Sequence, residues 1–201
     1  MRTTAEAAAR TRGAVLDAAL FCFAESGWDR STLEGIGQRA GLTRGAVYHH
    51  FGDKSSLLRA VLRESWATQS EPLLAPLLDA GVAPSQRLTD FLTSYLVKLG
   101  SDPSLRALAI VTTLVARHVR GPVEGMDDHR LALDVWREHL TRVISACTLR
   151  SGTTPAQVLF SLIALITGAT LEASTDPAHL PDPTAAGVVA AAAVRGWVEE
   201  N

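Results

Sequence analysis

Residues 31 to 54 read STLEGIGQRAGLTRGAVYHHFGDK, and this stretch decides how the rest of the chain is interpreted. Ser31 followed three residues later by Glu34 is the pattern of a capping box, which predicts that a helix begins there. Gly41 is expected to end that short helix, because glycine readily adopts the left-handed conformation that follows many helices. Thr43 can then cap a second helix, whose apolar positions recur at helical spacing: Ala46, Val47 and Phe51.

Two short helices about a glycine turn are typical of a helix-turn-helix motif, whose second helix enters the major groove of DNA. That second helix carries polar side chains that can hydrogen-bond to base edges or phosphates: Arg44, Tyr48, His49 and His50. Gly45 would allow close approach to a duplex. Because neighbouring helix residues point about 100° apart, we expect one of the two adjacent histidines to face DNA and the other to pack.

The residues in and around this motif resemble the signature of TetR/AcrR-type bacterial transcriptional regulators. They are Thr43-Arg44-Gly45-Ala46-Val47-Tyr48, then His50-Phe51 and Asp53-Lys54, with FCFAESGW at 21–28 before them and LLRAVL at 57–62 after them. The resemblance implies an all-α fold with a three-helix, helix-turn-helix DNA-binding domain at residues 1–52. A larger helical domain for ligand binding and dimerisation would follow at residues 53–201.

Composition agrees with a helical, specific DNA binder. The 201 residues are 47% hydrophobic and only 5% aromatic, and the net charge of −2 argues against a polycation that coats nucleic acid. Residues 1–54 hold seven basic and six acidic side chains, so charge is only mildly concentrated there. Cys22 and Cys147 are expected to be free thiols in the core.

No segment at the N-terminus has the long apolar core of a signal peptide, so we expect a cytoplasmic protein. The most apolar stretch, Val158 to Leu171, is shorter than the roughly 20 residues that span a bilayer. We therefore expect no membrane partner.

Helical periodicity predicts about nine helices and no strand. Before the motif, a polar arm at residues 1–9 should lead into a helix from about Arg10 to Ser26. The prolines at 72, 76 and 84 predict a connection between two helices. The helices after the motif are expected at 53–70, 85–99, 102–118, 127–150, 155–174 and 184–199.

The last two predicted helices are apolar on nearly every side, which means that both are buried all round. Burial inside the subunit accounts for one face of each, whereas pairing with the same helices of a second copy accounts for the whole circumference. We therefore predict a homodimer with a four-helix interface at these residues: Leu162, Ile166, Val189 and Trp197.

The resemblance also implies roles for individual residues of the motif. It implies that Thr43, Arg44, Tyr48 and His49 contact the operator, with Gly45 allowing close approach and with Thr32 and Lys54 on phosphates. The planar fork of Arg44 can pair with guanine, but a contact to phosphate alone is equally consistent with the sequence.

By the same resemblance, a ligand pocket lies in the second domain, between the helix after the motif and the helices before the dimer interface. The segments there supply Trp66, Phe91, Tyr95, Thr112, Thr113, His118, Trp136 and His139. Aromatic walls with a few hydroxyls and an imidazole suit an amphipathic molecule, whereas a plain core would use Leu and Val. Most of these residues would equally suit an ordinary core.

The sequence therefore favours a repressor that binds a palindromic, double-stranded DNA operator as a homodimer and is released by a small apolar or amphipathic effector, without a cofactor. An alternative keeps the fold and DNA binding but gives the C-terminal domain only dimerisation or protein docking. A third hypothesis, an all-helical enzyme, lacks a nucleophile motif, and no two of the six histidines have the i, i+3 or i, i+4 spacing of a helix-borne metal site. We expect no enzymatic activity.

Overall fold

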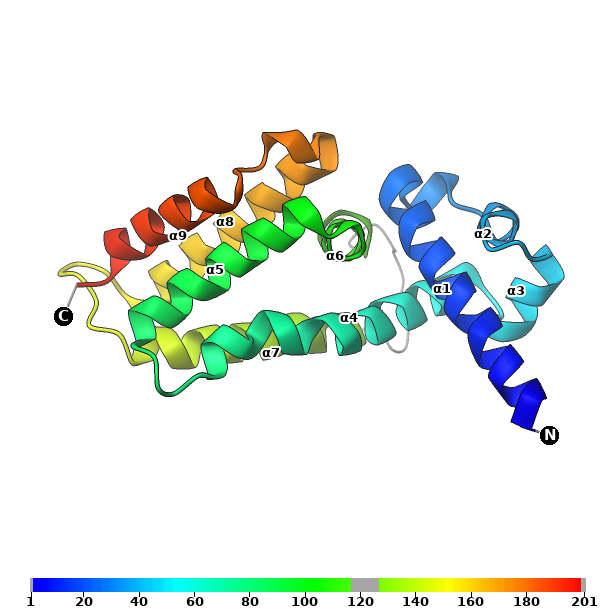
Figure 1. Ribbon diagram of the computed structural model, residues 1–201, viewed down its shortest axis with the longest axis horizontal. Helices are drawn as coiled ribbons and strands as arrows, with labels where there is room; N and C mark the ends of the chain where they lie inside the picture. Colours follow the sequence, from blue (N-terminus) through cyan, green and yellow to red (C-terminus); the bar gives the residue numbers. More distant parts are fainter. Residues whose placement is uncertain (1, 117–126, 200–201) are drawn as a thin grey trace. The chain divides into compact units, whose positions relative to one another are not determined.

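The computed structural model describes residues 2–116 and 127–199 (Figure 1). Within these residues the chain forms nine α-helices and no strand, apart from one isolated antiparallel bridge between Leu149 and Val198. The predicted all-α fold is therefore confirmed. The helices divide between two compact units, Met1–Trp66 with Ala107–His129, and Ala67–Arg106 with Arg130–Asn201. The functional division at residue 52 stays a prediction.

The first unit is built on a long N-terminal helix, α1 (Arg2–Arg30), whose apolar stripe is buried: Val15, Ala19, Leu20 and Phe23. The predicted start at Arg10 was wrong, because the helix already begins at Arg2. Residues 5–9 are AEAAA, and alanine has the strongest intrinsic helix propensity. Gly27 interrupts α1 near its end with a φ of 72° and a ψ of −177°.

The two short helices of the motif are α2 (Leu33–Arg39) and α3 (Arg44–Phe51). Thr43 caps α3 as predicted, and its side chain accepts from the backbone N–H of Ala46 at 3.3 Å. The cap of α2 is Thr32, not Ser31, and it accepts from the N–H of Gly35 at 3.0 Å. Ser31 instead lies buried, and its hydroxyl donates to the Gly27 carbonyl near the end of α1 at 2.6 Å.

A close approach at Gly37 sets the packing of α2 on α3. A Cβ atom added there would lie 3.1 Å from the carbonyl oxygen of Leu42 and 3.3 Å from Cγ2 of Val47. Gly37 and Val47 are both buried. The glycine therefore lets the turn and α3 pack directly against α2.

α4 (Lys54–Leu78) follows α3 after Gly52 and Asp53. The predicted connection from Pro72 was wrong, because α4 continues through Pro72 and Pro76. A proline inside a helix costs about 3 kcal/mol or more. Three leucines that lie between or beside the prolines are almost fully buried, and their burial offsets this cost: Leu73, Leu74 and Leu77.

The second unit is arranged around α5 (Pro84–Ser101), against which both α8 (Pro155–Thr175) and α9 (Pro183–Trp197) pack. Figure 1 shows these three helices side by side. A short 3-10 helix, η3 (Pro177–His179), joins α8 to α9.

Two helices end earlier than predicted. α6 (Pro103–Ile110) does not run to His118 as an α-helix but continues as a π-helical segment, η1 (Val111–Val115), and His118 lies outside the described residues. α7 (Asp127–Ser145) stops before Arg150. The backbone of residues 148–150 instead pairs with the end of α9, where Arg150 N–H donates to the Trp197 carbonyl at 3.0 Å.

The different surroundings of Gly37 and Gly13 predict opposite changes in stability when each glycine is replaced by alanine. Gly37→Ala should lower the free energy of unfolding by about 1 to 3 kcal/mol, because the new methyl group meets backbone atoms that cannot move cheaply. Gly13→Ala, in α1, meets nothing within 4 Å and should raise stability by about 0.5 to 1 kcal/mol. Urea denaturation of both variants measures this, and equal stabilisation by both would contradict the close packing of α2 and α3.

Candidate nucleic-acid interface

The second helix of the motif, α3, has one buried face and one polar, exposed face. Val47 and Phe51 point into the first unit and are 0% and 9% exposed. The residues predicted to contact DNA lie on the other side and are all exposed: Thr43, Arg44, Gly45, Tyr48 and His49. Tyr48 is 62% exposed although it is aromatic. An exposed aromatic ring beside polar groups is the arrangement expected of a binding surface.

The adjacent histidines take different environments. His49 is exposed, whereas His50 is half-buried and lies beside the Phe51 ring, with ring centroids 6.2 Å apart. The spacing of a helix predicts this difference. Thr32, expected on a phosphate, is also exposed, at the start of α2.

Lys54 has a different environment from the one that the resemblance implies. Its Nζ donates to the carbonyl oxygens of Trp28 at 2.7 Å and Ser31 at 3.0 Å, and lies 4.3 Å from the centroid of the Trp28 ring. Burial lowers the pKa of Lys54, and the carboxylate of Asp29 opposes this shift. The ammonium group therefore has two backbone acceptors, and its contact to a phosphate stays a prediction.

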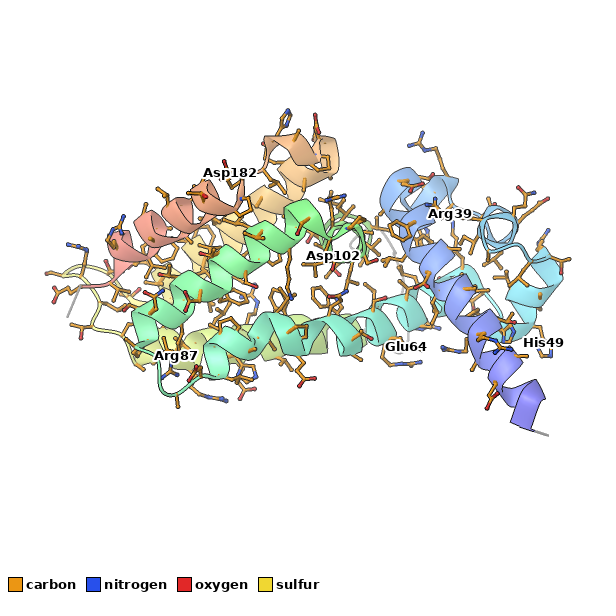
Figure 2. The ribbon with its side chains drawn as sticks, in the orientation of Figure 1. Arg39, His49, Glu64, Arg87, Asp102 and Asp182 are labelled. Atoms are coloured by element: carbon orange, nitrogen blue, oxygen red, sulfur yellow. The ribbon has the colours of Figure 1, made fainter. Side chains whose placement is uncertain are left out.

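Two ion pairs that sequence reasoning missed hold the helices of the first unit together. Arg12 on α1 donates two hydrogen bonds to the carboxylate of Glu64 on α4, and its guanidinium lies 5.1 Å from the centroid of the Phe51 ring. Arg39 on α2 donates to both oxygens of Glu25 on α1, at 2.5 and 2.9 Å. These hydrogen bonds lower the pKa of both carboxyl groups. Arg39 and Glu64 are labelled in Figure 2.

The two ion pairs join α1 to α4 and α1 to α2, and the Arg12 guanidinium also contacts α3 through the Phe51 ring. The pairs join residues 14 and 52 positions apart, so no short-range pattern could have revealed them. Each pair is partly exposed and contributes modestly to stability. Their role is therefore mainly geometric.

The residues predicted to bind a ligand fall into two separate groups. In the first unit, Nε1 of Trp66 donates to the Thr112 hydroxyl at 3.0 Å, and that hydroxyl donates to the Leu108 carbonyl at 2.7 Å. Thr113, next along η1, is half-buried.

In the second unit, the Trp136 ring meets two aromatic rings edge to face. Its centroid lies 5.6 Å from that of Phe91 and 6.0 Å from that of Tyr95. Thr170, a residue that the sequence analysis did not select, hydrogen-bonds to the Tyr95 hydroxyl at 2.7 Å. Burial raises the pKa of Tyr95 to about 12, so its hydroxyl stays neutral. His139 is half-buried.

The second unit also contains a cavity of about 160 Å³, at the start of α5 and the end of α9. None of the predicted ligand-binding residues lines it; its walls are Ser85, Gln86, Thr89, Ala191, Val194, Arg195, Val198 and Glu199. The aromatic residues Phe91, Tyr95 and Trp136 are at most 3% exposed. They pack in this structure as a core.

The apolar helices α8 and α9 each have an exposed face, but it is not entirely the face that was predicted. Leu162 and Ile166 are buried inside the subunit, so the prediction that a partner contacts them is corrected. Val189 is exposed and Trp197 is half-buried. The large apolar side chains exposed on the two helices are Phe160, Leu171, Val188 and Val189.

By length and composition alone, α8 could cross a membrane. Its most apolar window has a mean hydropathy of 1.6 and is 22% buried. The stretch considered in the sequence, Val158 to Leu171, was too short, because the helix has 21 residues, from Pro155 to Thr175. One such helix in the described part of the chain is weak evidence for a membrane protein, since core helices of proteins outside the membrane can be equally long and apolar.

Two short helices about a glycine turn, the second with a polar face outward and a packed face inward, define a helix-turn-helix DNA-binding protein. Residues 15–61 match the model of a family described as bacterial regulatory proteins, tetR family. Over 168 residues, 75% of this chain, the sequence is 33% identical to the HTH-type transcriptional repressor Rv1474c of Mycobacterium tuberculosis, of which it covers 88%. The chain belongs to the TetR family.

Solved structures agree with this assignment. NalD, the secondary repressor of the MexAB-OprM multidrug efflux pump in Pseudomonas aeruginosa, superposes with a TM-score of 0.72 and 26% identity, over 95% of this chain and 97% of that one. SmeT, the repressor of the SmeDEF multidrug efflux pump of Stenotrophomonas maltophilia, solved with triclosan, gives a TM-score of 0.74 and 27% identity, over 96% and 93%. The protein is a transcriptional regulator and not an enzyme.

Proposed function

We propose that the protein is a cytoplasmic repressor that binds a palindromic operator as a homodimer and is released by a small apolar or amphipathic molecule. The observation that carries this proposal is the exposed polar face of α3, held outward by the buried side chain of Val47. A helix with that division can lie in a major groove without losing its own packing.

Within that groove, different residues of the motif would contact base edges and phosphates. Arg44 lies at the first position of α3, and its guanidinium can donate two parallel hydrogen bonds to O6 and N7 of a guanine. Thr43, Tyr48 and His49 offer groups that suit phosphates or base edges, and Thr32 offers a hydroxyl at the start of α2. Gly45 leaves space for the sugar-phosphate backbone beside the helix.

Dimerisation is supported by the composition of the exposed faces of α8 and α9. On α8, Phe160, Leu171 and the small residues Ala164 and Gly168 between them are exposed and recur at helical spacing. An apolar helix face of this kind is costly in water and marks an interaction surface. Pairing it with its own copy about a two-fold axis buries the same patch on both subunits.

Ligand binding is supported by SmeT, which has been solved with triclosan, and by the mixed aromatic and hydroxyl character of the Phe91, Tyr95, Trp136 and Thr170 cluster. The same cluster gives support to the alternative, a C-terminal unit that only dimerises or docks a protein. Its rings pack closely and its hydroxyls already pair with each other, so a ligand would have to open this core.

An effector would act only through a difference in affinity between two states. It must favour a state in which the two α3 helices of the dimer no longer match half-sites about 34 to 36 Å apart. By linkage, operator DNA must weaken effector binding by the same factor.

A selection from random duplexes tests the proposed DNA recognition. The wild type should enrich a palindrome, and Arg44→Ala should lose about 1 to 3 kcal/mol of binding free energy and relax the preference at one position in each half-site. Arg142→Ala, which removes an exposed charge from α7, is the charge-matched control and should select the wild-type sequence. Unchanged sequence preference for Arg44→Ala would leave that residue only a phosphate contact.

The dimer face predicts different outcomes for two residues of α8. Phe160→Glu places a charge on the exposed face and should give monomers in sedimentation that no longer hold a palindromic site. Leu162→Ala should instead lower stability by about 2 to 5 kcal/mol through a cavity while the protein remains a dimer. A wild type that is monomeric at micromolar concentration would refute the proposed interface.

A thermal-shift screen against a library of small amphipathic compounds separates the ligand-responsive repressor from the alternative. A compound at 100 times its Kd should stabilise the folded protein by about 2.7 kcal/mol, since it binds only that state. Trp136→Phe, which changes the central ring of the Phe91, Tyr95 and Trp136 cluster at little cost in volume, should weaken this response and leave DNA binding nearly intact. If no compound shifts the melting temperature, a C-terminal unit without a ligand is the better description.

A further inference from the structure

Lys54, the last residue of the stretch 31–54, hydrogen-bonds back to Ser31, the first residue of that stretch. Nζ of Lys54, at the start of α4, donates to the carbonyl oxygen of Ser31 at 3.0 Å, immediately before the cap of α2. The same Nζ donates to the Trp28 carbonyl at 2.7 Å and lies over the Trp28 ring at 4.3 Å. One ammonium group thus joins the two ends of the motif.

The electrostatics of the helices explain why these partners are needed. A cation at the first position of α4 is unfavourable, because the N-terminal end of a helix carries a partial positive charge. The end of α1, broken at Gly27, presents carbonyl groups that have lost the regular pattern of helical hydrogen bonds. The Ser31 hydroxyl donates to the Gly27 carbonyl at 2.6 Å, with the Cys22 carbonyl also within reach at 3.0 Å, and Lys54 donates to the carbonyls of Trp28 and Ser31.

The Trp28 ring completes this arrangement. It is half-buried and stacks on Phe23 of α1, with centroids 5.8 Å apart and planes at 21°. The ring face turned toward Lys54 attracts the ammonium group by a cation–π interaction. Asp29 lies near enough to favour the charged form of the lysine.

We propose that Lys54 is a positioning residue of the helix-turn-helix, which fixes where α2 begins relative to where α3 ends, and that it does not neutralise a phosphate of the operator. This inference rests on the proposed DNA binding. Without the ammonium group, the start of α4, which follows α3 after Gly52 and Asp53, loses its hydrogen bond to the residue before the cap of α2. The direction of α3 in the groove would then vary. Base contacts need one direction, whereas non-specific phosphate contacts tolerate several.

The test is Lys54→Met, which keeps an apolar stem over Trp28 and removes the charge. Binding to the duplex selected by the wild type, and to a scrambled duplex, is measured over a range of salt concentrations. We expect a loss of about tenfold or more for the selected duplex, little change for the scrambled one, and an unchanged slope of log K against log salt. A phosphate contact predicts the opposite, namely equal losses on both duplexes and a slope smaller by about 1.8 for two subunits.

Trp28→Leu provides the matched variant, because it keeps the lysine charge and removes the ring beneath it. Because the backbone carbonyls of residues 28 and 31 remain, a positioning role predicts a loss of preference for the selected duplex that is smaller than that of Lys54→Met, again without a change in the salt slope. Binding is measured well below the melting temperatures of both protein variants. If both variants bind both duplexes with unchanged affinity, Lys54 contributes only to stability and the inference is overturned.

A measurement without DNA keeps this inference separate from the proposed function. The chain has two lysines, Lys54 and Lys98, so nitrogen-15 labelling of lysine gives two ammonium signals. The Lys54 signal should exchange with water more slowly than that of Lys98, and Trp28→Leu should speed it up. If the two ammonium groups exchange equally fast in the wild type, the inference is overturned even if the protein binds DNA. If the wild type selects no duplex, the proposed function alone is refuted.

Discussion

The direct packing of α3 on α2 is the constraint on which the rest of the first unit depends. Gly37 brings the two helices so close that Val47 and the turn at Leu42 fill all the space beside it. Once that contact is made, Val47 and Phe51 must point inward, and the polar side of α3 must point outward. Arg12, Glu64 and Lys54 then secure this arrangement from α1 and α4. A binding surface results from the packing of small apolar groups that never touch the ligand.

Local features of the sequence predicted this part of the structure well. The cap at Thr43, the turn at Gly41 and the inward positions of Val47 and Phe51 all depend on residues fewer than five positions apart. The family resemblance adds the larger unit that follows. Features that depend on distant partners were not predictable in this way, and they include the ion pair of Arg12 with Glu64 and the hydrogen bond between Tyr95 and Thr170.

The errors at particular residues have related causes. Ser31 and Thr32 both suit a helix cap, and only the tertiary position of the α1 carbonyls decides which hydroxyl goes where. Leu162 and Ile166 were assigned to the dimer face because a helix that is apolar all round gives no sign of which side meets its own subunit. Burial against α5 settles that question, and it leaves Phe160 and Leu171 exposed. Pro72 predicted the end of a helix, but α4 continues through it because burial of the neighbouring leucines offsets the cost of the proline.

The separation of the two faces of α3 has a consequence for how such regulators diversify. Arg44, Tyr48 and His49 are exposed and contribute little to the core, so substitutions there change few packing contacts. Exposed positions generally tolerate replacement within about 0.5 kcal/mol. A duplicated gene could therefore acquire a new target sequence by changing these residues while the scaffold keeps its stability. The positions that can change at little cost in stability are thus the same ones that choose the target sequence. Gly37 and Val47, which are buried, would change far more slowly than the exposed surface of α3 that they hold in place.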